Sequence, residues 1–420
     1  MTERFGTEKQ LTQGPGGRIL TNCSVWSPDG QWLVYDTRSD AEGAVFDGTR
    51  VEIIHADTGQ IKTMYESRRG ACCGVATFHP LKDEIVFILG PEDPTPDWAY
   101  SPSHRQGVIV LVDSPGEAVN LDARDLTPPG TPGALRGGSH VHVFSPDGKW
   151  VSFTYNDALA DSTQRTVGVA VPGPVTVNKT HSRNRDGTYF STLVTRTVRS
   201  PRPGSDDIGQ ALEDGWIGTA GYVRGDGTRQ ARALAFQGQV MGADGRRFWE
   251  VFVCDLPEDI LHSGPNQRRV TFTENSQYPG ISGPRHWLRS SPDGAEIAFL
   301  GRDAAGQAQI WTVSPNGGPI RQVTHDPWPV ASAFTWDPAG ERIAYVADDS
   351  VFTVGVRDGL SERQTPRVDA ADTPLPLACV FCPEGRRIAF LRRPADRLEA
   401  RSNQSRSNQS RSNQICVVTL

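Results

Sequence analysis

Short stretches of alternating apolar and polar residues recur along the chain, joined in pairs by a tight turn. Residues 139–144 alternate before the turn Ser-Pro-Asp-Gly at 145–148, and residues 150–153 alternate after it. Proline, aspartate and glycine each favour tight turns, and alternation with period two is typical of a strand that buries one face. This segment therefore predicts a β-hairpin.

Related hairpins recur throughout the chain. Ser-Pro-Asp-Gly occurs again at 27–30 and 291–294, and degenerate versions of the turn open at His79, Asp337 and Cys382. Most neighbouring turns are 45 to 66 residues apart. A blade of four strands needs about 40–50 residues, so six hairpins of one design predict a radial β repeat.

One gap between turns is much longer than the others. The turns at Ser145 and Ser291 are 146 residues apart, and residues 231–236 and 249–254 inside the gap resemble two strands of a further repeat. We therefore predict an all-β fold: a single propeller domain over residues 1–420 with seven four-stranded blades. Six or eight blades are the alternatives.

The two ends of the chain together complete the closing blade. The last repeat ends with a strand at 415–420, where the chain stops. Residues 9–12, Lys-Gln-Leu-Thr, resemble the outer strand of an earlier repeat at 321–324, Arg-Gln-Val-Thr. An N-terminal strand added to the last blade would close the ring and remove two exposed sheet edges.

Two insertions interrupt the repeats. Residues 203–218 include Ser205 followed by acidic residues, a pattern typical of a capped helix start, so we predict a short helical insertion there. Residues 401–414 repeat Arg-Ser-Asn-Gln-Ser. Polar low complexity of this kind buries no core, and we predict a disordered hairpin loop.

Composition narrows the class of protein. The chain has 43 glycines and 31 prolines among 420 residues, which suits a turn-rich β protein. A net charge of −6 without a basic patch argues against a nucleic-acid partner. No apolar run reaches the ~20 residues of a membrane helix, no secretory signal opens the chain, and seven cysteines are an odd number for a disulfide framework. We therefore expect a soluble, cytoplasmic protein without a membrane partner.

Two histidines occupy the same place in their repeats. His140 and His286 each lie five residues before the residue that opens the turn, near the start of the innermost strand. By analogy of fold, inner-strand ends surround the channel in which propellers bind ligands. His142 should face the same way as His140, because strand side chains alternate with period two. The equivalent positions in four other repeats are Asn22, Gly74, Ser332 and Leu377.

These side chains offer two kinds of chemistry. The imidazoles of His140, His142 and His286 could hold one divalent cation, such as Mn or Ca, or one histidine could remove a proton next to a carboxylate. Guanidinium groups pair with carboxylates in bidentate fashion, so arginines are expected around an anionic substrate. The predicted catalytic residues are His140, His286 and Arg285, and the predicted substrate-binding residues are Arg136, Arg289, Asn22 and His104.

A structural role is the alternative for these histidines, as hydrogen-bonded packing residues between blades. Cys379 and Cys382 have the spacing of a redox or zinc pair, but on a strand their sulfurs point to opposite faces, and we predict that they are core residues. The chain has no phosphate-binding glycine loop, nucleophile elbow or His-Glu-x-x-His helix, which argues against ATPase, serine hydrolase and zincin activities.

Longer motifs resemble known families. Residues 291–324 resemble the TolB-type propeller repeat. Residues 136–146, 151–157, 203–206 and 284–287 resemble the YidR-like family of TolB-like propellers. The resemblance extends over nearly the whole chain and implies a fold without implying an activity. His140-Val141-His142 is similar to the His-x-His pair of oligogalacturonate lyases, which are propellers that hold a divalent metal with a histidine cluster.

Two functions stay open at this point. The first is a channel site for an acidic oligosaccharide, with β-eliminating lyase chemistry in which histidine is base or metal ligand and arginines neutralise the uronate carboxylate. The second is a non-catalytic scaffold that binds a protein or peptide over one face. Histidines that converge in the channel would favour the first function, and histidines dispersed between blades beside a broad apolar face would favour the second.

Overall fold

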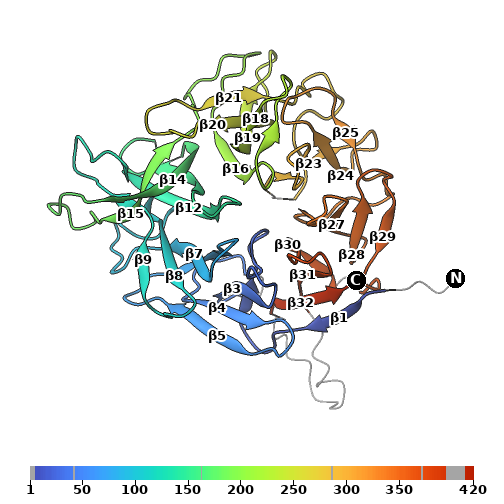
Figure 1. Cartoon of the computed structure of the whole chain (residues 1–420), viewed down its shortest axis with the longest axis horizontal. Coiled ribbons are helices and arrows are strands. Elements are labelled where there is room, and N and C mark those ends of the chain that lie inside the picture. The colour runs from blue at the N-terminus through green and yellow to red at the C-terminus, as the bar shows by residue number, and fades with distance from the viewer. Residues whose placement is uncertain (1–4, 41–42, 162, 285–286, 370–371, 394–411) are drawn as a thin grey trace.

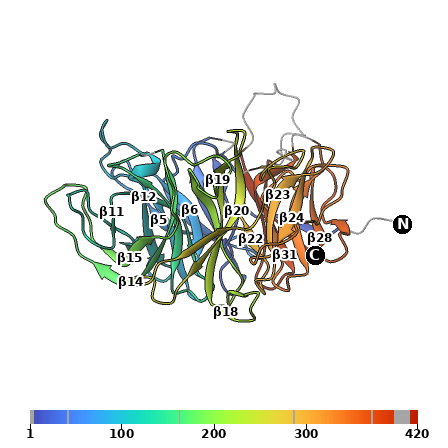
Figure 2. The ribbon, with the colours of Figure 1, turned by 90° about the horizontal axis from the view of Figure 1, so that it is seen from above.

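The computed structural model describes residues 5–40, 43–161, 163–284, 287–369, 372–393 and 412–420. They form seven four-stranded antiparallel sheets, arranged in a ring with their inner strands toward its centre (Figure 1). Turned by 90°, the ring is wider than it is tall (Figure 2). The predicted all-β propeller with seven blades is confirmed.

The blades follow one another along the chain. Blade 1 is β2 (Gly17–Ile19), β3 (Trp32–Arg38), β4 (Arg50–His55) and β5 (Ile61–Glu66); blade 2 is β6 (Cys73–Phe78), β7 (Glu84–Leu89), β8 (Gln106–Leu111) and β9 (Ala118–Asn120). Blade 3 is β12 (Gly137–Phe144), β13 (Val151–Asp157), β14 (Arg165–Val175) and β15 (Gly187–Leu193); blade 4 is β16 (Ala211–Trp216), β19 (Arg232–Met241), β20 (Arg247–Leu256) and β21 (Asn266–Arg269).

Among the remaining blades, blades 5 and 6 have inner strands of only two residues. Blade 5 is β22 (Arg289–Ser290), β23 (Ile297–Arg302), β24 (Ala308–Val313) and β25 (Arg321–Gln322); blade 6 is β26 (Thr335–Trp336), β27 (Arg342–Ala347), β28 (Ser350–Gly355) and β29 (Ser361–Arg363). Blade 7 is β30 (Pro374–Phe381), β31 (Arg387–Arg392), β32 (Gln414–Thr419) and β1 (Thr7–Gln10). The connections hold the short pairs β10 (Ala123–Arg124) with β11 (Ala134–Leu135) and β17 (Tyr222–Val223) with β18 (Arg229–Gln230), and the 3-10 turn Pro102–His104.

The ring closes through the N-terminal strand. β1 pairs antiparallel with β32, from Thr7 opposite Thr419 to Gln10 opposite Cys416. Just beyond the strand, Thr12 accepts a hydrogen bond at 2.9 Å from the backbone N–H of Ile415. Strands from the two ends of the sequence therefore share one sheet, as the repeat pattern predicts.

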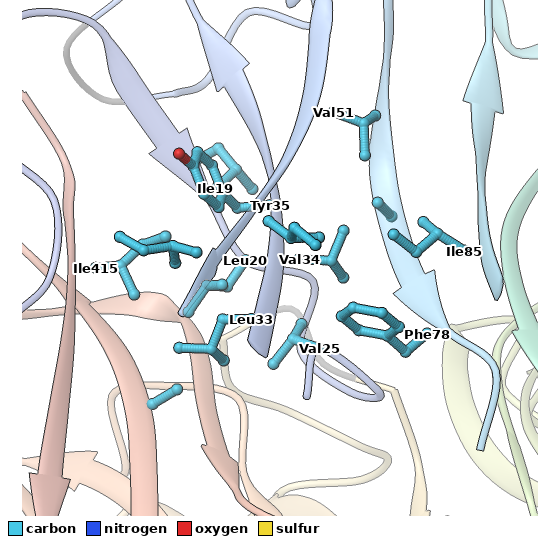
Figure 3. Close-up of a cluster of buried hydrophobic side chains, with 14 of the residues drawn as sticks. Ile19, Leu20, Val25, Leu33, Val34, Tyr35, Val51, Phe78, Ile85 and Ile415 are labelled. Atoms are coloured by element: carbon cyan, nitrogen blue, oxygen red, sulfur yellow. The ribbon is translucent and has the colours of Figure 1, made fainter. Parts of the chain in front are cut away.

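Apolar side chains fill the space between neighbouring blades. One such cluster joins three blades: it contains Val34 of blade 1, Phe78 of blade 2 and Ile415 of blade 7 (Figure 3). All three side chains are almost completely buried. Each sheet buries both faces in this way, which explains why the central strands are nearly continuous apolar runs. Cys379 and Cys382 are buried in this core, as predicted, and none of the seven cysteines forms a disulfide.

Three tryptophans that follow or end the inner strands of their blades also join blades by hydrogen bonds. The indole N–H of Trp26 donates to the carbonyl of Val380 at 3.1 Å, from blade 1 to blade 7. Trp216 donates to Val143 of blade 3 at 3.0 Å, and Trp336 donates to Arg289 of blade 5 at 2.9 Å. Each bond leads to the inner strand of the preceding blade, so the indoles fix the inner strands around the channel.

The predicted helix at 203–218 is wrong. Residues 203–205 lie in a turn, and β16 follows as the inner strand of blade 4. The acidic residues do not belong to the first turn of a helix. Asp207 pairs with Arg202 at 2.8 Å, whereas Glu213 and Asp214 are buried in the strand. Strand alternation is disguised here because the pairing register shifts between Leu212 and Gly215.

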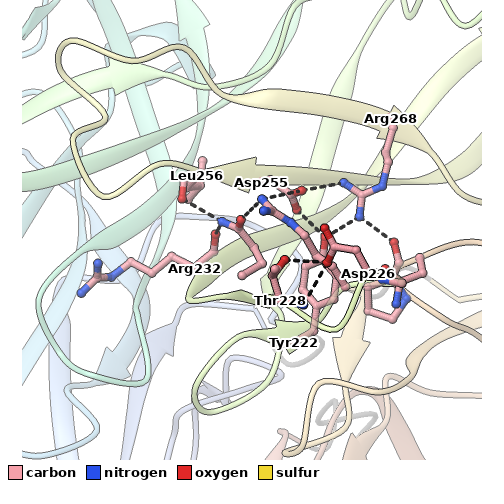
Figure 4. A network of polar contacts seen from close by, with 12 residues as sticks. Tyr222, Asp226, Thr228, Arg232, Asp255, Leu256 and Arg268 are labelled. Carbon is pink, nitrogen blue, oxygen red and sulfur yellow. Dashed lines mark hydrogen bonds and ion pairs between the residues drawn. The ribbon is translucent and has the colours of Figure 1, made fainter.

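An insertion between β16 and β19 explains why the fourth repeat is irregular. The hairpin β17–β18 occupies this insertion, and Tyr222 on it donates a hydrogen bond to Asp255 of β20 at 2.7 Å. Arg268 of β21 pairs with Asp255 at 3.0 Å and donates to the Tyr222 hydroxyl at 2.6 Å (Figure 4). This network fixes the hairpin to the outer half of blade 4.

Two further sequence expectations concern the chain outside the sheets. Residues 394–411, which include most of the predicted low-complexity loop, lie outside the described residues. Within the described part of the chain, no helix has the length and apolar character needed to cross a membrane.

The indole bonds give a stability prediction. Trp336→Phe keeps an aromatic ring but leaves the carbonyl of Arg289 without its donor, so we expect it to destabilise the protein by about 1–2 kcal/mol. Trp150→Phe is the matched control, because Trp150 is equally buried and its indole donates to no described residue. The measurement is the urea midpoint of each variant against the wild type. Equal shifts for the two variants would show that ring size, and not the inter-blade bond, accounts for the loss.

Candidate functional site

Two cavities lie along the central channel. The channel cavity has a volume of about 290 Å³, and the turn cavity, at the Ser-Pro-Asp-Gly ends of the inner strands, about 440 Å³. Prolines and aromatic residues dominate the turn cavity. The channel cavity mixes polar and apolar groups, among them Asn22, Arg38, Phe46, Arg105, His140, Trp287 and Leu377.

A hydrogen bond crosses the channel between the two cavities. The guanidinium of Arg289, on the inner strand of blade 5, donates to the side-chain oxygen of Asn22 in blade 1. Blades 5 and 1 are not neighbours in the ring, so this bond spans the channel. Arg289 lines the turn cavity and Asn22 lines the channel cavity. The two predicted substrate-binding residues therefore come together, and their bond links the wall of one cavity to the wall of the other.

His140 lies on the wall of the channel cavity. Asn22 and Leu377, which hold the equivalent position in blades 1 and 7, line the same cavity. His140 is 2% exposed and belongs to β12, the inner strand of blade 3. The argument from matched repeat positions therefore locates three side chains around one space. Arg285 and His286, two of the predicted catalytic residues, lie outside the described residues.

His142 faces away from the channel cavity, contrary to the expectation from strand alternation. A bulge interrupts the pairing of β12 between His140 and Val143, and Val141 adopts a left-handed backbone with φ of 57°. The extra residue reverses the side on which the following side chains lie. His142 consequently packs between blades 2 and 3, as the structural alternative for the histidines supposed.

A buried polar chain surrounds His142. Its Nε2 lies 3.0 Å from the hydroxyl of Ser139, which donates to Asp122 at 3.0 Å. The backbone N–H of Gly107 donates to the same carboxylate oxygen at 2.6 Å, and a Cβ at Gly107 would meet the imidazole. The hydroxyl lies between imidazole and carboxylate, so the order differs from that of a hydrolase triad. Burial lowers the pKa of His142 to about 3, and the nearby Arg105 adds to this shift.

Two arginines that sequence analysis missed line the channel cavity. Arg38 ends β3 and pairs with the buried Asp36 at 2.6 Å. Arg105 follows the 3-10 turn, and its Nε donates to the hydroxyl of Tyr100 at 2.8 Å. The ring of Phe46 stacks on Tyr100 with centroids 4.7 Å apart, and the Arg38 guanidinium lies 4.4 Å from the centre of that ring.

This cage positions two positive charges beside His140. Cation–π contacts hold guanidinium groups in a fixed orientation. The described lining of the channel cavity contains both arginines and no aspartate or glutamate. The cavity is therefore positively charged, although Asp36 partly compensates Arg38. No local motif marks these arginines in the sequence, because Phe46 and Tyr100 reach them from loops that belong to different blades.

Two other predicted substrate contacts lie elsewhere. Arg136 is half-exposed and pairs with Asp157 at 2.6 Å, at a separate cavity on blade 3. The imidazole of His104 stacks on Trp98 with ring centroids 3.7 Å apart, and its Nδ1–H donates to the Ala99 carbonyl at 2.7 Å. Neither side chain lines the channel cavity.

The described residues around His140 do not fit a divalent cation. His142, the expected second ligand, faces the interface between blades, and the other charged groups lining the cavity are guanidinium groups. Among the described residues, no group of three or more histidine, cysteine, aspartate or glutamate side chains could hold a metal ion. Divalent cations favour several convergent imidazole, thiolate or carboxylate donors, whereas this donor set suits an anion.

The fold and cavity define a class of protein: a seven-bladed propeller with a basic, ligand-sized cavity in its central channel. Residues 72–185 match a family described as a protein of unknown function, DUF3748. The chain is 42% identical over 410 residues to YidR of Escherichia coli (strain K12), described as an uncharacterized protein, with 91% of this chain and 94% of the relative covered. The chain belongs to the YidR family, and the resemblance seen in the sequence is confirmed.

Solved structures share the fold at much lower identity. An oligogalacturonate lyase in complex with manganese has a TM-score of 0.57 at 12% identity, with 99% of this chain and 93% of the other covered. An oligogalacturonate lyase from Vibrio parahaemolyticus has a TM-score of 0.55 at 11% identity, with the same coverage. At this identity the likeness shows a common propeller fold.

The burial of His142 gives a prediction about pH. The unfolded chain takes up a proton near pH 6.5, whereas folded His142 stays neutral to about pH 3, so acid favours the unfolded state. Because of this group, the free energy of unfolding should decrease by about 1.4 kcal/mol for each pH unit below pH 6.5. His142→Gln should remove that part of the slope, so its free energy of unfolding should fall by about 2 kcal/mol less than that of the wild type between pH 6.5 and 5. Urea unfolding at the two pH values measures this difference.

The matched control for this measurement is His181→Gln, which removes an exposed imidazole and should keep the slope of the wild type. A His142→Gln slope equal to that of the wild type would contradict a neutral, buried imidazole.

Proposed function

We propose that the channel cavity binds a small acidic sugar through Arg38 and Arg105, and that His140 acts there as the base of a β-elimination. The observation that carries the proposal is the lining: two guanidinium groups and one imidazole surround a space of about 290 Å³, and none of the described lining residues is acidic. That volume is close to the lower limit for small-molecule sites, about 300 Å³. The aromatic side chains of Phe46 and Trp287 give the same cavity apolar surface for a sugar ring.

The chemistry fits these groups. In β-elimination from a uronate, a base removes the proton at C5, next to the carboxylate, and a C4=C5 double bond forms. The C4–O bond breaks, its electron pair leaves with the departing sugar, and that oxygen takes up a proton. Negative charge develops on the carboxylate as C5 loses its proton, so fixed guanidinium groups stabilise the transition state more than the ground state.

The structural neighbours suggest a substrate class for this proposal, because two oligogalacturonate lyases share the propeller fold. The fold alone supports no activity, since one fold serves many functions. The proposal therefore rests on the described cavity and its charge, and the neighbours supply the first substrates to test.

Binding and turnover can be tested separately. Arg105→Gln should weaken binding of digalacturonate about 10–100-fold, because a hydrogen bond to a charged group contributes about 1.5–3 kcal/mol. His140→Asn should abolish unsaturated product while binding stays within a few-fold of the wild type. Titration calorimetry measures the first effect, and ultraviolet absorbance of the unsaturated product measures the second.

Arg136→Gln is the matched control. It removes the same charge from a surface arginine outside the channel cavity, and we expect binding and turnover like those of the wild type. Binding without product in the wild type would retain the ligand site and reject the lyase. Two results would reject both the ligand site and the lyase activity and would favour the scaffold function. One is no binding of uronates of one to four units, and the other is an equal loss of affinity in Arg105→Gln and Arg136→Gln.

The cation hypothesis has its own test. Because the described lining is basic, we expect purified protein to bind less than about 0.1 equivalents of Mn or Ca, as measured by elemental analysis. Near-stoichiometric metal that is lost in His140→Ala and His286→Ala, with folding unchanged, would contradict this expectation and restore the predicted histidine centre.

A further inference from the structure

A second basic cavity lies outside the central channel, between blades 2 and 3. This interblade cavity has a volume of about 640 Å³. Four arginines line it, together with two acidic residues of one loop. They are Arg69, Arg124, Arg183, Arg185, Glu92 and Asp93.

Most of these charges already have partners. Arg69 pairs with Glu92 at 3.6 Å and also contacts Asp93. Arg183 donates to the backbone carbonyls of Glu92 and Asp93 at 2.6 and 2.9 Å. Arg69 and Arg183 thus hold the two carboxylates and their loop. The charges of the other two arginines, Arg124 and Arg185, are not neutralised by these carboxylates through an ion pair.

Arg124 is buried and bonded to backbone. Its Nε donates to the carbonyl of Gly137 at 3.3 Å, and one terminal nitrogen donates to the carbonyls of His104, at 3.1 Å, and Arg105. These acceptors are neutral carbonyl groups, so the positive charge of Arg124 is not neutralised by them.

Arg185 has no partner for its side chain within the described residues. Its Nε is buried without a hydrogen bond, while part of the residue stays accessible and lines the interblade cavity. Asp122, which is fully buried, attracts the Arg185 charge most strongly, and Glu92 adds a smaller attraction. Neither carboxylate forms an ion pair with Arg185 within the described residues. One oxygen of the Asp122 carboxylate likewise has no hydrogen-bond partner.

The backbone holds these two arginines side by side. Arg124 and Arg185 form an antiparallel bridge, with N–H to carbonyl distances of 2.9 and 3.0 Å in the two directions. Residues paired in this way point to the same face, and like charges directly opposite each other are destabilising. Burial and this neighbouring charge lower the pKa of Arg124, and burial lowers the pKa of Arg185 to about 10. Two adjacent cations therefore share the buried carboxylate of Asp122, and Glu92 adds only a smaller attraction to Arg185.

We propose that the interblade cavity is a second ligand site, in which the Arg185 guanidinium binds the anionic group of a small polyhydroxylated molecule. An anion there would relieve the repulsion between the paired arginines, and guanidinium binds carboxylate or phosphate oxygens in bidentate fashion. On the wall, the side-chain amide of Gln106 donates to Asn120 at 3.0 Å, and its carbonyl oxygen has no hydrogen-bond partner among the described residues, so it can accept from a hydroxyl. The volume exceeds that of a bare anion. Sugar acids and sugar phosphates share this chemistry, and the binding experiment distinguishes them.

The test uses the full chain and three probes: inorganic phosphate, glucose 6-phosphate and galacturonate. Titration calorimetry with the wild type should show binding of one of the two sugar probes, tighter than that of inorganic phosphate. Arg185→Gln should weaken it at least tenfold, and Ala118→Glu, which adds a carboxylate to the cavity wall without removing an arginine, should weaken it as much. The sugar probe that binds identifies the source of the anionic group.

Lys179→Gln is the matched control, because Lys179 is a half-exposed cation that pairs with Asp186 and does not line the cavity. It removes the same charge and should leave affinity unchanged. Thermal melts check folding, and Ala118→Glu decides the outcome where Arg185→Gln does not fold. Equal loss in Lys179→Gln, unchanged affinity in Ala118→Glu, or no binding of any probe at 10 mM would overturn the proposal.

The channel site is distinguishable in the same experiment. Arg105→Gln removes a cation of the channel cavity and retains Arg185, so it should leave binding at the interblade cavity intact. A probe lost in Arg105→Gln but kept in Arg185→Gln belongs to the channel cavity, which would support the proposed function and contradict the second site for that probe.

Discussion

One extra residue in the inner strands decides which side chains reach the channel. In blades 2, 3 and 4 the register of the inner strand shifts by a residue, and Val75, Val141 and Glu213 take left-handed backbones with φ near 56°. A β-branched residue in this conformation costs roughly 1–2 kcal/mol, so the surrounding packing must enforce it. At Val75 the enforcing contact is visible: its N–H donates to the buried carboxylate of Asp36 at 2.8 Å.

The bulge separates the inner strand into a channel side and an interface side. Before it, His140 faces the channel cavity; after it, His142 packs against blade 2, and Asp214 at the matching place in blade 4 contacts Thr154 of blade 3 at 3.4 Å. Polar groups after the bulge therefore serve the contacts between blades. The same constraint explains why one histidine of the His-x-His pair is a candidate for chemistry and the other is a structural residue.

Sequence reasoning predicts the propeller well because its strongest signals are local. Each Ser-Pro-Asp-Gly turn specifies a hairpin within ten residues, and counting turns gives the blades. The side chain of His142 could not be placed this way, because Val141 gives no sign of a left-handed residue. The prediction of a helix at 203–218 was wrong for a related reason. Acidic residues usually lie at solvent-exposed positions, whereas Glu213 and Asp214 are buried beside the bulge.

The arginines of the two cavities show why the candidate site was only half predictable. Arg105 lines the channel cavity and Gln106 lines the interblade cavity, since consecutive residues of an extended chain point to opposite sides. Arg124 reaches across from the interblade side and holds the carbonyls of His104 and Arg105. The position of the channel guanidinium thus depends on a buried arginine almost twenty residues further along the chain, a contact that exists only once blades 2 and 3 pack together. A charge in either cavity acts on the same short segment, so the two basic cavities are parts of one electrostatic arrangement built on the junction of these blades.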